Sequence, residues 1–251
     1  MQWPYVLGLG YSIMLAFVYG LIQLNTKSRL LFPSILFIST AFAAVGAFFW
    51  VLRKYAARNF KPTFSVAWIC LSAGTFMWFL GTTTQALQAA LLGTAPFPSF
   101  ADFFFVGGYL TIGFGLFLIF KLFSPSFTKK MLSLSAVSDV SLSAIVSSSL
   151  LTPILTSKTD FPTIVFSVAY PILDLGLFVL VLANFLIFIK GSVGKAWFFL
   201  TLGVALNIAG DLFFSYAKLL GSYYEGHPLE LFWLWGYVTL LLGCYIHRRE
   251  L

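Results

Sequence analysis

The residues of this sequence that could do chemistry are three aspartates inside segments otherwise apolar enough to cross a membrane. Asp174 lies within AYPILDLGLFVLVL (169–182), Asp139 lies in a serine-rich segment, and Asp211 lies on a continuous polar stripe. Ionisable side chains in membrane helices face the bundle interior or a water-filled cavity, where they bind ions, recognise ligands or pass protons. The three aspartates are therefore the first candidates for a functional site.

Each aspartate shares a helix face with polar or small residues spaced three or four positions apart. Pro171 precedes Asp174, and because proline removes a backbone donor we expect a kink or a local polar opening there. We expect the serine-rich segment, 131–153, to lie in the bundle interior, because hydroxyls and a carboxylate facing lipid would be desolvated without partners. The residues that share these faces are Ser135 and Ser143 with Asp139, Ser167 and Tyr170 with Asp174, and Gly203, Asn207, Ser215 and Lys218 with Asp211.

The elements that must position these residues are membrane helices. Of the 251 residues 60% are hydrophobic and only 9% are charged, which is too little polar surface for a water-soluble globule. Apolar segments of about 20 residues, long enough to cross a hydrocarbon core, predict an all-α polytopic membrane protein with one membrane domain, 1–251. The eight predicted segments are 3–24, 32–52, 63–92, 101–122, 131–153, 162–189, 196–220 and 230–247.

Lysine and arginine are distributed unequally between the two ends of these segments. Because basic loops stay in the cytoplasm, their distribution predicts a multi-pass protein of the cell membrane with both termini cytoplasmic. The net charge of +7 then reflects topology and anionic inner-leaflet lipids, and we expect no nucleic-acid partner. The predicted cytoplasmic residues are Arg53, Lys54, Arg58, Lys61, Lys121, Lys129, Lys130, Lys190, Lys195, Arg248 and Arg249, and the predicted outer ones are Lys27, Arg29, Lys158 and Lys218.

The sequence also repeats itself with a shift of 128 to 129 residues. The repeat predicts two four-helix halves, 1–123 and 131–251, which have the same orientation because each contains an even number of spans. Thr82 of the first half aligns with Asp211 of the second, so we expect the site in the second half. The other aligned positions are DFFFVGGY (102–109) with ELFWLWGY (230–237), and Trp68, Gly74 and Gly81 with Trp197, Gly203 and Gly210.

We expect the three aspartates to line a polar cavity that is open toward the outside. At about 1.5 Å per residue, Asp139 and Asp174 are placed roughly 12 to 13 Å from the cytoplasmic boundary and Asp211 roughly 22 Å from it. No basic residue shares their depth, so burial and mutual repulsion predict that at least one carboxyl group is protonated at neutral pH. The candidate ligand-binding residues are Asp139, Tyr170, Asp174, Asn207, Asp211, Ser215 and Lys218.

Aromatic and polar residues gather at the outer end, in GSYYEGHPLELFWLWGY (221–237). They could form an interfacial aromatic belt, which is common in membrane proteins. They could also line a vestibule, with the aligned loop GTAPFPSFAD (93–102) as its second lip. The candidate vestibule residues are Asp102, Tyr223, Tyr224, Glu225, His227, Glu230 and Trp233.

The stretches SDVSL, AYPILD and AGDLFF, followed by GSYYEG and LFWLWGY, resemble the polytopic amino-terminal input modules of bacterial and archaeal signalling proteins. PFPSFADFFFVGGYLTIGFG is similar to the matching hairpin of those modules, which precede histidine kinase, PAS or diguanylate cyclase domains. The resemblance implies a sensor in signal transduction. Because the sequence stops at HRREL, we expect it to act through a separate partner. The resemblance places Asp102, Asp139, Tyr170, Pro171, Asp174, Gly210, Asp211, Trp233, Gly236 and Tyr237 on recurring positions of the family.

Three function classes stay open: a sensor-type or ligand-binding module, a proton or cation pathway or transporter, and a structural subunit of a membrane complex. Stacked acids on neighbouring helices are how proton relays are built. The corresponding partners are the lipid bilayer, a membrane or cytoplasmic signalling protein, or further copies in an oligomer.

Enzymatic activity is not expected. An intramembrane aspartyl protease would carry a tyrosine next to its first acid, whereas Tyr170 lies four residues before Asp174. The two cysteines and two histidines have no metal-ligand or haem-ligand spacing. We therefore expect no metal site, and the sequence specifies no cofactor.

Overall fold

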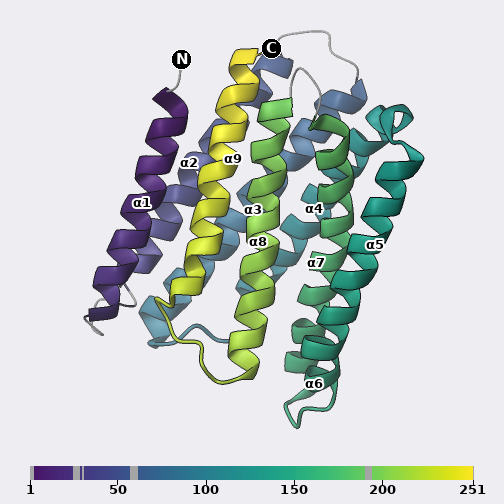
Figure 1. Ribbon diagram of the computed structural model, residues 1–251. Coiled ribbons are helices and arrows are strands. Elements are labelled where there is room, and N and C mark those ends of the chain that lie inside the picture. The colour runs from purple at the N-terminus through teal and green to yellow at the C-terminus, as the bar shows by residue number, and fades with distance from the viewer. Residues whose placement is uncertain (1–2, 25–28, 30, 57–61, 190–193, 251) are drawn as a thin grey trace.

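The computed structural model describes residues 3–24, 29, 31–56, 62–189 and 194–250, and these residues form helices and turns without any strand. Eight helical segments are long and apolar enough to cross a membrane, which confirms the all-α polytopic prediction (Figure 1). One of these segments is built from α5, a π-helical turn and α6. The helices are α1 (Trp3–Leu24), α2 (Leu31–Ala56), α3 (Pro62–Leu92), α4 (Phe100–Phe123), α5 (Lys129–Val146), α6 (Thr152–Leu155), α7 (Phe161–Phe188), α8 (Gly194–Leu219) and α9 (Leu231–Glu250).

Six of the helices form a closed ring. Each packs against the next in the order α2, α3, α4, α7, α8 and α9, and α9 returns to α2. The remaining two spans lie outside the ring, with α1 against α9 and α5 against α7; in Figure 1 they lie at opposite edges of the bundle. The ring encloses the main apolar core, in which Trp68 and Trp197 meet with ring centroids 6.0 Å apart.

Glycines let the ring helices approach closely at equivalent places in the two halves. A Cβ atom at Gly74 of α3 would lie 3.0 Å from the carbonyl oxygen of Gly108 of α4, and one at Gly203 of α8 would lie 2.9 Å from that of Gly236 of α9. Small residues at such crossings are typical of membrane helix pairs. These glycines are the ones that the repeat aligns, so their contacts support the division into halves at 1–123 and 131–251, which stays a prediction.

The serine-rich helix α5 lies at the periphery and not in the interior, so the expected location was wrong. The face with Ser135, Asp139 and Ser143 is nevertheless the more covered one, with Ser135 buried. Exposed hydroxyls on α5 donate to carbonyl oxygens of their own helix: Ser133 to Lys129 at 3.1 Å and Ser141 to Val137 at 2.7 Å. Such hydrogen bonds satisfy serine within a helix. The serines therefore need no partner helix, and α5 can present them outward.

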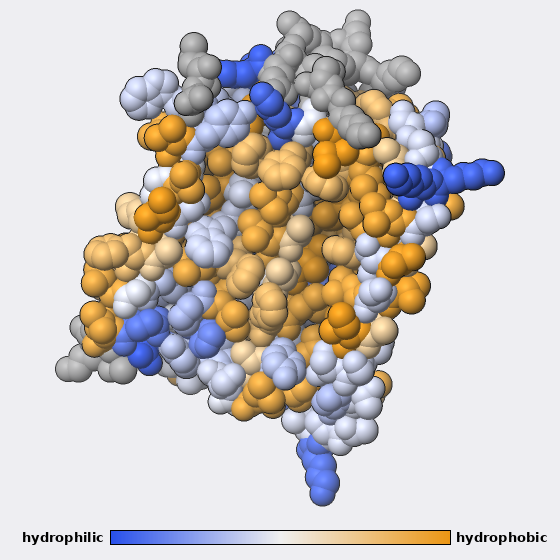
Figure 2. Space-filling view, viewed as in Figure 1, coloured by the Kyte–Doolittle hydropathy of each residue, from blue (hydrophilic) through white to orange (hydrophobic). Residues whose placement is uncertain are grey.

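On the face of the molecule seen in Figure 2, hydrophilic side chains gather toward the two ends of the bundle, and apolar side chains cover most of its middle. The end at which α1 begins and α9 ends carries most of the basic residues. Among the described residues these are Arg53, Lys54, Lys121, Lys129, Lys130, Lys195, Arg248 and Arg249, against Arg29, Lys158 and Lys218 at the other end. Lys27, Arg58, Lys61 and Lys190 lie outside the described residues.

Candidate functional site

Two of the three aspartates meet at one tyrosine. The hydroxyl of Tyr109 on α4 is hydrogen-bonded to Oδ1 of Asp174 on α7, at 2.7 Å, and to Oδ2 of Asp211 on α8. The indole Nε1 of Trp233 on α9 donates to Oδ1 of Asp211 at 3.0 Å. The site therefore joins four consecutive helices of the ring.

A glycine directly precedes both Tyr109 and Asp211 in the chain, and each glycine leaves space for a tryptophan side chain that packs on the residue after it. A Cβ atom at Gly210 would lie 2.7 Å from Nε1 of Trp233, so only glycine lets this indole reach Asp211. Gly108 gives the same room to Trp78, whose ring packs edge-on against Tyr109 with centroids 5.4 Å apart. The Gly-Tyr and Gly-Asp pairs are thus packing requirements of the site.

The hydrogen-bond geometry favours a shared proton. A tyrosine hydroxyl has one hydrogen, so Tyr109 cannot donate a full hydrogen bond to each of two carboxylates. Both contacts are satisfied when one of the two carboxyl groups carries a proton and donates it to the tyrosine oxygen. Asp174 fits that role, because it is fully buried and its Oδ2 has no hydrogen-bond partner among the described residues, a position that favours a neutral group.

Asp211 fits the role of the charged partner. Its two oxygens accept from Tyr109 and from Trp233, and donors of this kind stabilise a carboxylate. Asp211 is also only partly covered by protein, whereas Asp174 is fully buried. The pair therefore consists of an enclosed acid and a more accessible one, bridged by a hydroxyl.

Asp102 is connected to this pair through a second tyrosine. The hydroxyl of Tyr170 on α7 donates to Oδ1 of Asp102 at 2.5 Å, and the rings of Tyr170 and Tyr109 pack edge to face with centroids 6.1 Å apart. Asp102 also caps the start of α4, accepting from the backbone N–H of Ser99 at 2.5 Å. This candidate vestibule residue is thus an extension of the aspartate site.

Glu230, an acid of the outer segment 221–237, is a buried anchor. It accepts hydrogen bonds from the hydroxyls of Tyr19, at 2.7 Å, and Tyr223, at 2.9 Å, and from the backbone N–H of Gly226, at 2.7 Å. Burial raises the pKa of the Tyr223 hydroxyl well above its usual value, and the neighbouring Glu230 adds to this. Glu230 therefore fastens peripheral α1 to the loop between α8 and α9.

The other residues of that loop contact both α1 and the loop itself. The Tyr224 hydroxyl donates to Gln23 Oε1 at 2.7 Å, and Nδ1 of His227 accepts from the backbone N–H of Leu229 at 3.1 Å. Burial lowers the pKa of His227. Burial also raises the pKa of Glu225, and the nearby ammonium of Lys218 opposes this effect.

Four candidate ligand-binding residues do not contact Asp174 or Asp211 directly. Asp139 accepts from Ser135 at 3.1 Å on its own helix, and its other oxygen is buried without a described partner. The amide of Asn207 donates to the Gly203 carbonyl at 2.8 Å. Ser215 lies one turn after Asp211 on α8. The fourth residue is Lys218, whose Nζ lies 4.1 Å from the centroid of the Phe97 ring.

The depth expected for Asp174 was wrong. It lies midway along α7, about 21 Å from the C-terminal end of that helix. Asp211 lies about 25 Å from the N-terminal end of α8, which is at the same end of the bundle. Their similar level in the bundle is what allows one tyrosine to reach both, whereas Asp139 lies closer to that end, on α5, which packs against α7 from outside the ring.

Sequence reasoning missed Tyr109 itself, although the repeat contains the signal. Tyr109 aligns with Tyr237, and Thr82 aligns with Asp211. The structure pairs them crosswise, with Tyr109 bonded to Asp211 and Tyr237 bonded to Thr82. Each tyrosine thus contacts a helix of the other predicted half: Tyr109 contacts the seventh span and Tyr237 contacts the third. Of these two aligned contacts, only the one at Asp211 involves an acid.

A second polar cluster, also missed, lies at the C-terminal end of α9. His247 is fully buried, its Nε2 is hydrogen-bonded to the Tyr55 hydroxyl, and its ring lies 4.5 Å from that of Trp68. Mostly apolar buried residues separate it from Tyr109: Ile112, Leu116, Val204 and Leu240, together with Ser72, Thr75 and Thr201, whose hydroxyls donate to carbonyl oxygens of their own helices. Two polar centres therefore lie on either side of an apolar layer.

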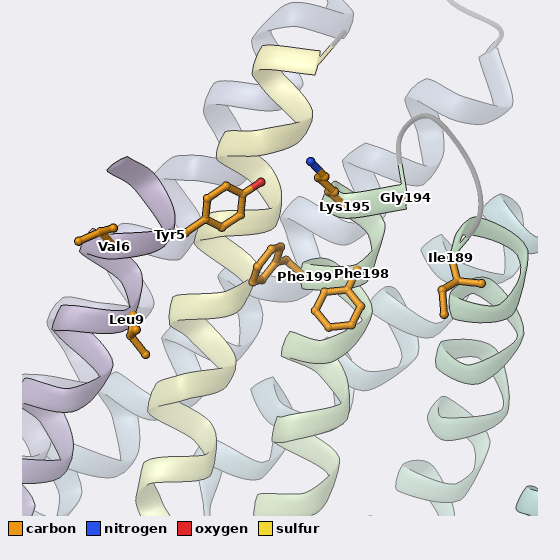
Figure 3. A pocket seen from close by; sticks show the side chains of 8 residues that line it. All are labelled: Tyr5, Val6, Leu9, Ile189, Gly194, Lys195, Phe198 and Phe199. Atoms are coloured by element: carbon orange, nitrogen blue, oxygen red, sulfur yellow. The ribbon is translucent and has the colours of Figure 1, made fainter. Parts of the chain in front are cut away.

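Neither of two cavities in the described part of the chain is lined by an acid. The larger, about 690 Å³, lies between α1 and α8 near Lys195 (Figure 3). The smaller, about 10 Å³, lies in the apolar layer. The outward-facing cavity stays a prediction.

Among the described residues, no three His, Cys, Asp or Glu side chains are grouped to hold a metal ion. Comparison of the chain with protein-family models, with curated proteins and with solved structures found no match.

Proposed function

We propose that this protein is a membrane-embedded sensor-type module whose ligand is a cation, in the simplest case a proton, held by Asp174, Tyr109 and Asp211. It lies in the cell membrane with both termini in the cytoplasm, and it acts through a separate partner. The observation that carries the proposal is the single hydroxyl shared by two carboxyl groups, because such an arrangement holds one proton and can accept another. Coupled acids of this kind titrate as a pair.

Uptake of a second proton has a structural consequence. A protonated Asp211 becomes a donor at one oxygen, so it can no longer accept from both Tyr109 and Trp233. One of these hydrogen bonds must break or reverse. Because Trp233 belongs to α9, the change reaches the helix that continues to His247 at the inner end, which is how an outer ligand could affect an inner partner.

A proton or cation pathway is the second candidate, and stacked acids on neighbouring helices favour it. A pathway needs polar groups or water across the whole bilayer. The buried side chains of Ile112, Leu116, Val204 and Leu240 between the two polar centres support binding over passage. A structural subunit, the third candidate, has no need of a shared proton.

The test is pH-dependent infrared difference spectroscopy of the purified protein in liposomes. We expect a carboxyl protonation signal that is lost in Asp211→Asn, shifted to another pH in Asp174→Asn because the coupled partner is gone, and unchanged in Asp139→Asn, the matched control outside the pair. The same liposomes, loaded with a pH-sensitive dye, should show no proton flux under a pH gradient. Flux that disappears in Asp174→Asn would instead establish the pathway, and a signal unchanged in all three variants would remove both proposals.

A further inference from the structure

We infer that the groove between α1 and α8, at the end of the bundle that carries the termini, binds an anionic phospholipid. One acyl chain lies in the groove, and the phosphate group lies at its rim beside Lys195. This inference goes beyond the proposed function and does not depend on it.

The groove arises because α1 and α8 both pack on α9 and leave space between themselves. They approach each other through Tyr5 and Phe199, whose rings have centroids 5.7 Å apart. The space has a volume of about 690 Å³, within the usual range of ligand pockets. Figure 3 shows the side chains of both helices around it.

The lining changes in polarity along the groove as a phospholipid does along its length. The rim carries the hydroxyl of Tyr5 and the ammonium of Lys195, which is the second residue of α8. Below the rim the walls are apolar: Val6, Leu9 and Phe198 are 57%, 64% and 40% exposed. Leu9 lies about 9 Å from the start of α1, so the apolar walls extend well below the rim.

The charge at this end selects an anionic headgroup. Among the residues whose side chains the structure describes, it carries eight basic residues and no acidic one. Basic side chains near a membrane surface attract anionic lipids. The apolar walls offer water few hydrogen-bond partners, unlike the walls of a water-filled pocket. A phospholipid fits both parts of the groove, with its acyl chain along the apolar walls and its phosphate group at the basic rim.

Native mass spectrometry of the detergent-purified full chain, with equal amounts of phosphatidylglycerol and phosphatidylcholine, tests the headgroup. We expect one preferentially bound phosphatidylglycerol. Lys195→Gln should lower its occupancy about fivefold without changing that of phosphatidylcholine. The matched control is Lys130→Gln, which removes the same charge at the same end but on α5, and it should keep the preference.

A second pair of variants tests the acyl chain. Leu9→Trp fills the groove without changing charge and should abolish the preferential binding, whereas Leu7→Trp, at an exposed position outside the lining, should not. Equal losses in both lysine variants would mean general attraction to the basic end and overturn the site. Unchanged binding in Leu9→Trp would also overturn the site. So would a dimer that added lipid does not dissociate and that Leu9→Trp abolishes, because a second copy of the chain would then occupy the groove.

Discussion

Replacing Tyr109 by phenylalanine removes the hydroxyl that joins Asp174 to Asp211 while keeping the ring that packs against Trp78. Asp174 loses its only described hydrogen-bond partner, because its other oxygen already has none. A buried polar group left unpaired costs about 1 to 3 kcal/mol, and more when it is charged. Asp211 keeps the indole of Trp233. We therefore expect Tyr109→Phe to lower the free energy of unfolding by about 3 kcal/mol near neutral pH.

The loss should depend on pH in a defined direction. Removing a donor disfavours a carboxylate more than a neutral carboxyl group. The destabilisation should therefore be larger at about pH 8, where the pair carries charge, than at about pH 5, where it holds more protons. The measurement is reversible denaturant unfolding in mixed micelles at both pH values. The native chain and Tyr109→Phe are compared at equal detergent composition.

The symmetry-related tyrosine supplies the control. Tyr237 is equally buried, but its hydroxyl is bonded to the neutral side chain of Thr82. Tyr237→Phe should cost about 1 kcal/mol, the net value of an ordinary hydrogen bond, with a smaller change between the two pH values than Tyr109→Phe, because Asp211 is near Tyr237 while the Tyr237 hydroxyl is bonded to Thr82. Equal losses in Tyr109→Phe and Tyr237→Phe, or a Tyr109→Phe loss that is independent of pH, would refute the shared-proton reasoning.

Two further predictions concern the elements around the site. Gly210→Ala places a Cβ atom 2.7 Å from Nε1 of Trp233. In thermal unfolding it should destabilise the protein by about 1 to 3 kcal/mol, and the indole fluorescence should change. The control is Gly176→Ala, where no atom lies within 4 Å of the added Cβ atom; it should be neutral or stabilising in the same assay. At the start of α7, hydrogen bonds from the hydroxyl and the backbone N–H of Thr163 lower the pKa of Asp160 below its usual value. The contribution of this cap is present above the ordinary aspartate pKa and is lost as pH falls through the lowered one. Hydrogen-exchange protection of the first turn of α7 should therefore fall with acid in the native chain but not in Asp160→Asn, which caps without titrating; equal acid sensitivity in both would exclude the capping account.

The spans could be predicted from the sequence because the bilayer sets one length and one polarity for every helix. That constraint acts on each segment alone, so the eight predicted segments fall on the eight apolar helices. Which helices neighbour one another is decided by side-chain packing between them. The polarity of α5 therefore gave the wrong location, since Ser133 and Ser141 bond their own backbone and do not report a neighbouring helix.

The acids of the site could be predicted for a similar reason, and their partners could not. An acid in an apolar helix is easy to recognise as a candidate functional residue because burying it in a membrane costs free energy. This criterion identified Asp174 and Asp211, but it selected Asp139 equally. A tyrosine is ordinary in a membrane protein with 11 of them. Only the spatial meeting of α4, α7 and α8 distinguishes Tyr109 from the rest, and that meeting depends on packing between segments far apart in the chain.

The crosswise pairing explains how a charged site can exist in a repeated scaffold. Gly74 with Gly108 and Gly203 with Gly236 hold equivalent helix pairs at equivalent spacing, and neither contact involves an acid. Tyr109 and Tyr237 are therefore placed by packing alone, each against the opposite half. An aspartate at the Thr82 position of one half changes the chemistry of one contact while leaving the packing of both intact. In the function that we propose, the neutral contact serves as a structural joint, and the acidic contact at Asp211 is the place where a proton is gained or lost.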